Sequence, residues 1–499
     1  MYNVKNRLLE HLYNQRFGGT MNTKMIGAIV VVVIVLVAAV IVFIPGDSED
    51  DDDTSDTSDT TSSYGLSDNI DGRLTIFGNA NEDDYIDYRD VEAVKAIIAG
   101  EIEPTYFDCY LTYGGKTVQR CLADANCDGK IDEADVEWIE NMVDRKENMQ
   151  VYFYDVDSVC TSVTYPLSTM AAGYKSNYEA IIICGANEDV LYACNQITDE
   201  TSTYYQWYHD YFADAQSIGS RFTPDYEVFV AEGNEIPSAF ISGTRLWFDE
   251  DMEETLAPLG VDVVRLPFWE DNVTVSGIIT LGYLLQCEEA AYEYAEMADQ
   301  VLETIEDAVA DIDEEDRPLV FASPTATNIK AMHAGIQEFV YAAGGITPLD
   351  VGYSSGDIDA EGVTAMDPDW ICLRLYYGFL EEYDTLETSL EAAYYELVNT
   401  DLQYLQAIVE TTAYAEGNVL IFSQGSYMGP ASYINIAYLA NYLYPDLFDF
   451  DVDALFAEYL AAYHPEWSVE DFEGLQYYCL QDILNYYGDD YPLTYPTSP

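Results

Sequence analysis

Two twelve-residue stretches of the sequence place oxygen-bearing side chains at the spacing of a calcium loop. They read NANEDDYIDYRD, residues 79–90, and DANCDGKIDEAD, residues 124–135. Ca²⁺ takes about six to eight oxygen ligands, which such a loop supplies from positions 1, 3, 5, 9 and 12 and from the backbone carbonyl of position 7. We therefore predict two calcium sites, formed by Asn79, Asn81, Asp83, Tyr85, Asp87 and Asp90 in loop one and by Asp124, Asn126, Asp128, Lys130, Asp132 and Asp135 in loop two.

The two loops differ in charge and in their turn residue. Loop two has carboxylates at four of the ligand positions, while loop one begins with the neutral Asn79 and has three. Loop two also has Gly129 at the sharp turn, where loop one has Asp84. We expect loop two to bind Ca²⁺ more tightly than loop one. The alternative interpretation is a pair of acidic turns that bind no metal.

Each loop runs into an apolar helical stripe and ends in Asp, where an ordinary EF-hand has Glu. A duplicated loop of this kind resembles the dockerin domain, and the resemblance covers about residues 66–148. It implies a small all-α, EF-hand-like module that docks into a cohesin-like protein. The docking positions of the family correspond here to Tyr88, Arg89, Glu133 and Ala134, which differ between the two copies.

Ahead of this module the sequence predicts a membrane anchor. Residues 25–44 form an uncharged apolar run that is long enough to cross a bilayer as a helix, and a cleaved signal peptide is the alternative. Basic residues precede the run and acidic residues follow it, which places residues 1–24 in the cytoplasm, whether the chain starts at Met1 or Met21. Residues 45–65 are predicted to be an acidic, disordered tether. We expect a single-pass protein of the cell membrane whose bulk is extracellular.

Composition excludes one class of partner. The chain has 91 acidic residues against 19 Lys and Arg, for a formal net charge of −72. Such a charge repels the phosphate backbone, so we expect no binding of nucleic acid.

Cys109 and Cys121 flank a short loop and form either an extracellular disulfide or two buried free thiols.

The rest of the chain predicts two α/β lobes, residues 150–277 and 313–499. Apolar runs that are typical of doubly buried strands lie at 179–185, 226–232 and 261–267, and again at 318–324, 370–376 and 418–424. Between the lobes, residues 278–312 are predicted to form one continuous helix with an apolar face at 291, 295, 298, 302, 305, 309 and 312. The alternative is a helix within one large domain.

The order of these segments resembles that of ABC-transporter substrate-binding proteins of the helical-backbone class, which serve iron-siderophore, haem and cobalamin uptake. The matching pieces are TPDYEVFVAE, EDMEETLAPLGVDVVRLP, GYLLQCEEAAYEYAE, MDPDWICLRL and YLANYLYPDLF, in the family's order. The resemblance implies two Rossmann-like lobes joined by one long helix and a ligand cleft between them. It also implies an ABC permease as partner, which acidic residues, here Glu250 and Glu381, would contact.

Ligands of open α/β sheets lie beyond the carboxyl ends of the strands. Aromatic and polar residues that follow the predicted strands are therefore candidate ligand contacts, although core packing is the alternative for any one of them. They are Trp247, Phe248, Trp269, Arg374, Tyr376, Tyr377 and Tyr427.

The sequence thus predicts a membrane-anchored solute-binding protein for an iron chelate, haem or corrinoid-type ligand, with a calcium-dependent docking module. An alternative is a cell-surface interaction protein that acts mainly through dockerin–cohesin docking. We expect no enzymatic activity, because the chain contains no P-loop or GxGxxG motif and its four histidines form no HExxH pattern.

Overall fold

The computed structural model describes residues 73–200, 202, 204–268, 273–323, 339–347, 360–375, 407–423, 429–472 and 478–479. The chain divides into residues 1–60 and residues 61–499, and the described residues all belong to the second unit. The predicted cytoplasmic segment, membrane span and tether lie outside the described residues. Within the described ranges, no helix is long and apolar enough to cross a membrane.

The first lobe is built on a five-stranded parallel sheet. Its strand order is β11-β10-β5-β6-β7, and each neighbouring pair is parallel. The side chains of β5 and β10 are buried throughout, as a sheet covered on both faces requires. The strands are β5 (Met170–Ala172), β6 (Val190–Ala193), β7 (Gln216–Ser217), β10 (Ala239–Ser242) and β11 (Asp262–Arg265).

Helices and a small hairpin complete this lobe. The helices are α5 (Lys175–Ile183), α6 (Asn195–Thr198), α7 (Tyr205–Tyr208), α8 (Met252–Leu256) and α9 (Thr274–Leu285). The hairpin pairs β8 (Gly219–Ser220) with β9 (Thr223–Pro224).

The second lobe has a four-stranded sheet in the order β12-β13-β14-β15, whose first three strands are parallel and whose last is antiparallel. Its predicted strands at 318–324, 370–376 and 418–424 are confirmed. The elements are β12 (Val320–Ser323), β13 (Trp370–Leu375), β14 (Val419–Ser423), β15 (Tyr478–Cys479), α12 (Ala360–Met366), α15 (Thr412–Glu416), α16 (Ser432–Leu443) and α17 (Val452–Tyr463).

Two predicted strands of the first lobe are wrong. Residues 179–185 fall mostly in α5, and residues 226–232 begin with the 3₁₀ helix Tyr226–Val230. Every residue of α5 is buried, so its apolar run has no amphipathic period that would distinguish a helix from a buried strand. The strands that do form, β5, β6 and β10, are only three or four residues long.

The predicted continuous helix over residues 278–312 is also wrong, because the chain breaks at Gln286. This residue has a left-handed backbone, with φ of 60°, and separates α9 from α10 (Glu288–Val309). The apolar face predicted from Ala291 to Val309 is confirmed in α10, where all six positions are buried. With 22 residues, α10 alone spans about 33 Å.

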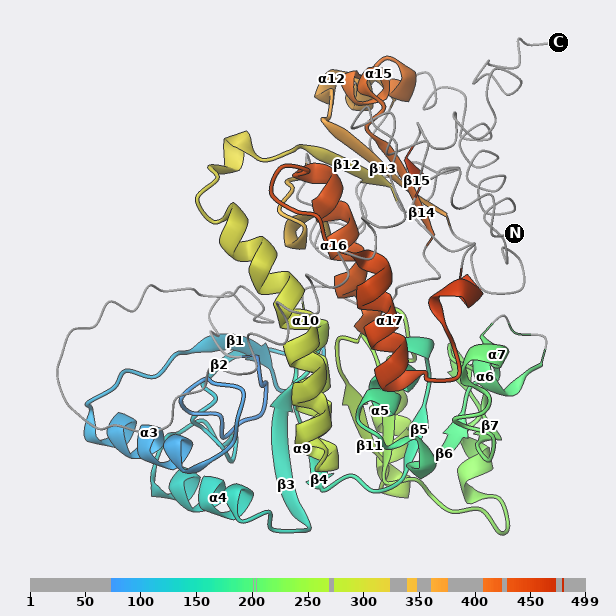
Figure 1. Cartoon of the computed structure of the whole chain (residues 1–499). Coiled ribbons are helices and arrows are strands. Elements are labelled where there is room, and N and C mark those ends of the chain that lie inside the picture. Colours follow the sequence, from blue (N-terminus) through green and yellow to red (C-terminus); the bar gives the residue numbers. More distant parts are fainter. Residues whose placement is uncertain are drawn as a thin grey trace, which may run out of the picture. The chain divides into compact units, whose positions relative to one another are not determined.

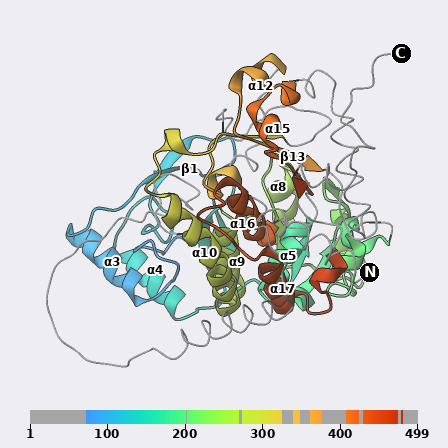
Figure 2. The ribbon, with the colours of Figure 1, turned by 45° about the horizontal axis from the view of Figure 1, so that its top comes forward.

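Helix α10 connects the two lobes. It contacts α9 and α5 of the first lobe and α16 of the second, and it lies beside α16 in both views (Figure 1, Figure 2). The Tyr294 hydroxyl donates a hydrogen bond to the carbonyl of Pro430, just ahead of α16. The join between the lobes is therefore a packed helix.

The calcium-loop module contains α3 (Tyr88–Ala99) and α4 (Glu133–Val143), each of which directly follows or overlaps the end of its loop. Between them lies a hairpin of β1 (Phe107–Tyr110) and β2 (Thr117–Arg120), so the prediction of an all-α module is wrong. A second hairpin, β3 (Met149–Tyr154) with β4 (Cys160–Tyr165), leads into the first lobe.

The module shares its core with the first lobe. Ile76 pairs with Phe153 and Tyr110 pairs with Val159 across isolated β-bridges. Ile76 and Met142 belong to the same buried cluster as the lobe residues. The segment from residue 73 onward is thus packed against the lobe.

Candidate functional site

Loop one folds back on itself through its carboxylates. The buried Asp90 accepts backbone N–H groups of Ala80 and Asn81 on Oδ1 and of Asp87 on Oδ2. Asp87 caps the start of α3, and Asp83 accepts the N–H of Tyr85. These contacts fix the backbone of the loop around the twelfth position.

Loop two repeats this arrangement. Asp135 accepts the N–H groups of Asn126 and Asp132, and Asp132 caps α4 with backbone angles close to those of Asp87. Asp124 accepts the N–H groups of Asp128 and Gly129 at 3.0 and 2.9 Å. The fourth residue of each loop, Glu82 and Cys127, has positive φ. The duplicated sequence spacing therefore corresponds to a duplicated loop conformation.

Burial destabilises the charged form of carboxylates in both loops, and a bound cation would offset that cost. Burial raises the pKa of Asp90 to about 7 and that of Asp124 to about 6, and it also raises the pKa of Asp135. Asn79 is fully buried, and its Oδ1 has no hydrogen-bond partner in the described part of the chain, although its Nδ2 donates to the carbonyls of Leu74 and Asp83. An unpaired buried oxygen at position 1 fits a hard cation that binds oxygen.

Other contacts compete for these oxygens. Arg89 forms ion pairs with Asp83 and Asp87, and Arg120 lies 3.6 Å from Asp124. Across the described ranges, no three His, Cys, Asp or Glu side chains gather as a metal-binding group. The oxygen donors are thus present in the loops, but their carboxylates bind backbone and arginine groups.

The four predicted docking residues, Tyr88, Arg89, Glu133 and Ala134, are all exposed. Cys109 and Cys121 are free and buried, which agrees with the second of the two alternatives for this pair. Cys127 of loop two instead forms a disulfide with Cys160 of β4.

Few of the predicted ligand contacts lie within the described part of the chain. Trp247 is 45% exposed, whereas Phe248 beside it is 8% exposed. Arg374 lies on β13, opposite Phe422 of β14. Trp269, Tyr376, Tyr377 and Tyr427 lie outside the described residues. Of the two predicted permease contacts, Glu250 is exposed and Glu381 lies outside those residues.

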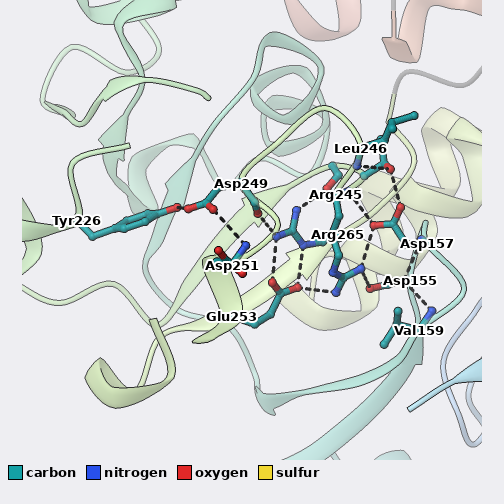
Figure 3. Close-up of polar contacts among 12 residues, drawn as sticks. Asp155, Asp157, Val159, Tyr226, Arg245, Leu246, Asp249, Asp251, Glu253 and Arg265 are labelled. Carbon is teal, nitrogen blue, oxygen red and sulfur yellow. Dashed lines mark hydrogen bonds and ion pairs between the residues drawn. The ribbon is translucent and has the colours of Figure 1, made fainter. Parts of the chain in front are cut away.

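A buried charge network lies at the carboxyl edge of the first-lobe sheet, just past β10 and β11 (Figure 3). Arg245 Nη1 lies 2.8 Å from Asp155 and 2.9 Å from Asp157, and Arg265 shares Glu253 with Arg245. Arg265 also donates to the carbonyls of Gly243 and Asp249. Both guanidinium groups are held by several protein partners, which indicates a structural role.

A second buried network joins the lobes. Glu179 of α5 accepts hydrogen bonds from Tyr208 and from Tyr459 of α17, and its Oε1 lies 2.6 Å from Nε2 of His464. Burial alone would raise the pKa of Glu179, but the charge of His464 and these hydrogen bonds outweigh it and lower the pKa. The predictions from sequence missed this contact, because its partners are 280 residues or more apart.

The residues that follow the short strand β5 were not predicted from the sequence either. Tyr174 is the last residue before α5, and the guanidinium of Arg221 lies over its ring.

A separate sequence motif, Gly-Tyr-Ser-Ser-Gly at residues 352–356, matches the spacing of a nucleophile elbow. It lies outside the described residues.

No family model matches the sequence, and no curated protein does either. Solved structures do match. The TroA-like periplasmic binding protein FepB from Veillonella parvula has a TM-score of 0.52 at 16% identity, over 66% of this chain and 99% of that one.

Two further structures are similar at lower scores. A periplasmic haem-binding protein from Pseudomonas aeruginosa has a TM-score of 0.41 at 18% identity, over 56% of this chain and 94% of its own. Helicobacter pylori CeuE with bound Ni(II) has a TM-score of 0.47 at 12% identity, over 65% and 99%. The match to FepB shows the fold: over 66% of its length, this chain has the architecture of that TroA-like periplasmic binding protein.

Proposed function

We propose that this protein is the solute-binding component of an ABC importer and that it captures an iron chelate, haem or a corrinoid between its lobes. The main support is the pair of mainly parallel sheets joined by α10, together with the fold match to FepB, which covers 99% of that chain. The carboxyl ends of parallel strands are where open α/β folds bind ligands. The protein carries out no chemistry on its ligand in this proposal.

Binding of the solute is testable by thermal unfolding of the full chain in detergent. Haemin, ferric citrate and cyanocobalamin represent the three ligand classes. A ligand at about a hundred times its dissociation constant should stabilise the fold by about 2.7 kcal/mol. If none of the three raises the unfolding temperature, the proposal fails for these classes.

The anchor belongs to the same proposal. Residues 25–44 would hold the protein in the cell membrane, with residues 45–65 as a spacer and the lobes outside the cell. Glu250 and Glu381 would contact the ABC permease. The test is protease treatment of sealed right-side-out membrane vesicles. We expect the protease to digest the lobes and to leave residues 1–24 intact.

We further propose that both loops bind Ca²⁺, and loop two more tightly. The unpaired Oδ1 of the buried Asn79 and the repeated loop conformation support this assignment. Calorimetric titration of the chelator-treated chain should show two sites, with Asp135→Asn removing the tighter one and Asp90→Asn the weaker. Two sites of equal affinity, or none, would contradict the proposal.

The exposure of Tyr88, Arg89, Glu133 and Ala134 favours a second function, docking onto a cohesin-like protein. A cell-surface interaction protein that acts mainly in this way is the alternative to solute uptake. A tight calcium-dependent protein partner, with no small ligand bound by the lobes, would favour that alternative.

A further inference from the structure

The carboxyl edge of the first-lobe sheet has two kinds of arginine. Arg245 and Arg265 are bound on several sides by carboxylates and carbonyls. Arg221, in the turn between β8 and β9, makes no hydrogen bond or ion pair with any described residue. In a chain with 91 acidic and 19 basic residues, an arginine that has no carboxylate partner among the described residues needs an explanation.

Aromatic rings hold Arg221 in place. Its Cζ lies 4.2 Å from the ring centroid of Tyr174, 4.5 Å from that of Phe222 and 5.9 Å from that of Phe248. Tyr174 follows β5 and Phe248 follows β10, which are neighbours in the sheet. Stacking orients a guanidinium through its flat face and leaves the N–H groups on its edge available.

Further positive charge gathers at the same corner. Lys175, the first residue of α5, is 4% exposed, and its Nζ lies 4.9 Å from the ring centroid of Tyr204. Burial raises the pKa of Tyr204, and the charge of Arg221 acts against that rise, so both cations lie near this ring. Two cations therefore share the edge beyond β5.

The start of α5 adds an independent observation. Tyr174 precedes the helix and provides no side-chain cap, and Ser176 in the first turn is 2% exposed. The Oγ of Ser176 is buried and has no hydrogen-bond partner among the described residues. A helix N-terminus favours negative charge, and an unpaired buried hydroxyl there favours a ligand that accepts its proton in a hydrogen bond.

We propose that Arg221, Lys175 and the N-terminus of α5 form an anion subsite that holds a carboxylate group of the solute. A guanidinium matches a carboxylate through two parallel hydrogen bonds, and the adjoining rings suit a flat ligand body. The inference rests on the proposed solute-binding function and narrows it. Among the three ligand classes, it selects carboxylate-bearing haem or a ferric carboxylate chelate over the amide-bearing corrinoid.

The test compares haemin with haemin dimethyl ester, which keeps the ring but lacks both free carboxylates. Wild type should bind haemin at least about tenfold more tightly than the ester, because charge-assisted hydrogen bonds are lost. Arg221→Gln should lose about tenfold for haemin and nothing for the ester, and Arg221→Lys should keep part of the difference. Lys116→Gln, which removes an exposed charge on the β1–β2 hairpin, is the matched control and should bind as wild type does.

Ferric citrate and cyanocobalamin complete the set. Loss of ferric citrate binding in Arg221→Gln, with wild-type unfolding temperature, also supports the subsite. Equal affinity for haemin and its ester, or unchanged haemin affinity in Arg221→Gln, overturns the anion subsite but leaves the proposed solute binding intact. Binding of cyanocobalamin alone has the same consequence. If no probe binds, both proposals fail. Should Arg221→Gln not fold, Arg221→Lys and the comparison of haemin with its ester decide the question.

Discussion

At the level of single residues, the arginines of the first lobe differ in their hydrogen-bond and ion-pair partners. Arg245 is 7% exposed, and its carboxylate partner Asp155 is fully buried. Burial raises the pKa of Asp155 to about 6 against the opposing charge of Arg245, so the pair is retained at a cost in desolvation. Such a pair ties the β3–β4 turn to the end of β10.

Replacing Arg245 by leucine should therefore be strongly destabilising, because it leaves Asp155 and Asp157 without their cation. We expect the free energy of unfolding to fall by about 3–5 kcal/mol at pH 7, as measured by urea titration. The control is Lys95→Gln, which breaks an exposed pair with Glu92 and should change stability by less than about 1 kcal/mol. Equal effects of the two substitutions would show that the buried network contributes nothing.

At the scale of elements, two contacts decide how the lobes are held. One is the corner between α9 and α10, where Gly282 allows close approach: a Cβ added to it would lie 2.5 Å from the Cβ of Ala291. The other is the buried contact of Glu179 on α5 with Tyr459 and His464 at the end of α17.

At the corner between α9 and α10, we expect the effects of two substitutions on the free energy of unfolding to be non-additive. Gly282→Ala should destabilise the protein by about 1–3 kcal/mol through overpacking. Ala291→Gly should cost about 1 kcal/mol as a helix-interior glycine. The double variant should cost less than the sum, because the two Cβ atoms no longer collide. Strict additivity in thermal unfolding would mean that the helices do not meet at this point.

The contact between α5 and α17 should make the stability of the protein depend on pH. A carboxyl whose pKa is lowered in the folded state contributes stability above its unfolded pKa, here about 4.5, and loses it as the pH falls through the folded pKa. Glu179→Gln should cost about 1.5–3 kcal/mol at pH 7, and this difference from wild type should shrink below about pH 4.5. Glu470→Gln, an exposed control, should show no such dependence. A difference that does not change down to pH 3 would exclude the charged contact.

At the scale of the whole molecule, the calcium loops are part of the same packed unit as the lobe. Arg73, just ahead of loop one, bonds Asp84 of that loop and Asp299 of α10, and the Tyr292 hydroxyl donates to the Asp84 carbonyl. Loop one is thereby fixed to the helix that connects the lobes. We therefore expect Ca²⁺ binding to loop one to stabilise both the calcium-loop module and the first lobe.

Scanning calorimetry of the full chain tests this coupling. The module and first lobe should unfold in one transition, and Ca²⁺ at about a hundred times its dissociation constant should stabilise that transition by about 2.7 kcal/mol. In the double variant Asp90→Asn, Asp135→Asn the transition should no longer respond to Ca²⁺. Two transitions, only one of which moves with Ca²⁺, would show that the module is energetically separate.

Much of this architecture was accessible from sequence. The spacing of the duplicated loops, the α/β class, the strands of the second lobe and the buried stripe of α10 all follow from local patterns of polar and apolar residues. These patterns are informative because each records which face of an element meets the core.

Tertiary structure decided the rest. The run at residues 179–185 is buried on all sides, so its sequence has no period that separates helix from strand. The left-handed backbone at Gln286 lets α9 turn and pack against α10, and the local spacing of apolar residues does not encode this contact. Whether an arginine is bound by several carboxylates and carbonyls, like Arg265, or makes no hydrogen bond with any described residue, like Arg221, depends on residues brought together by the fold. Local periodicity specifies faces, whereas charge pairing and helix corners depend on contacts that only the folded chain makes.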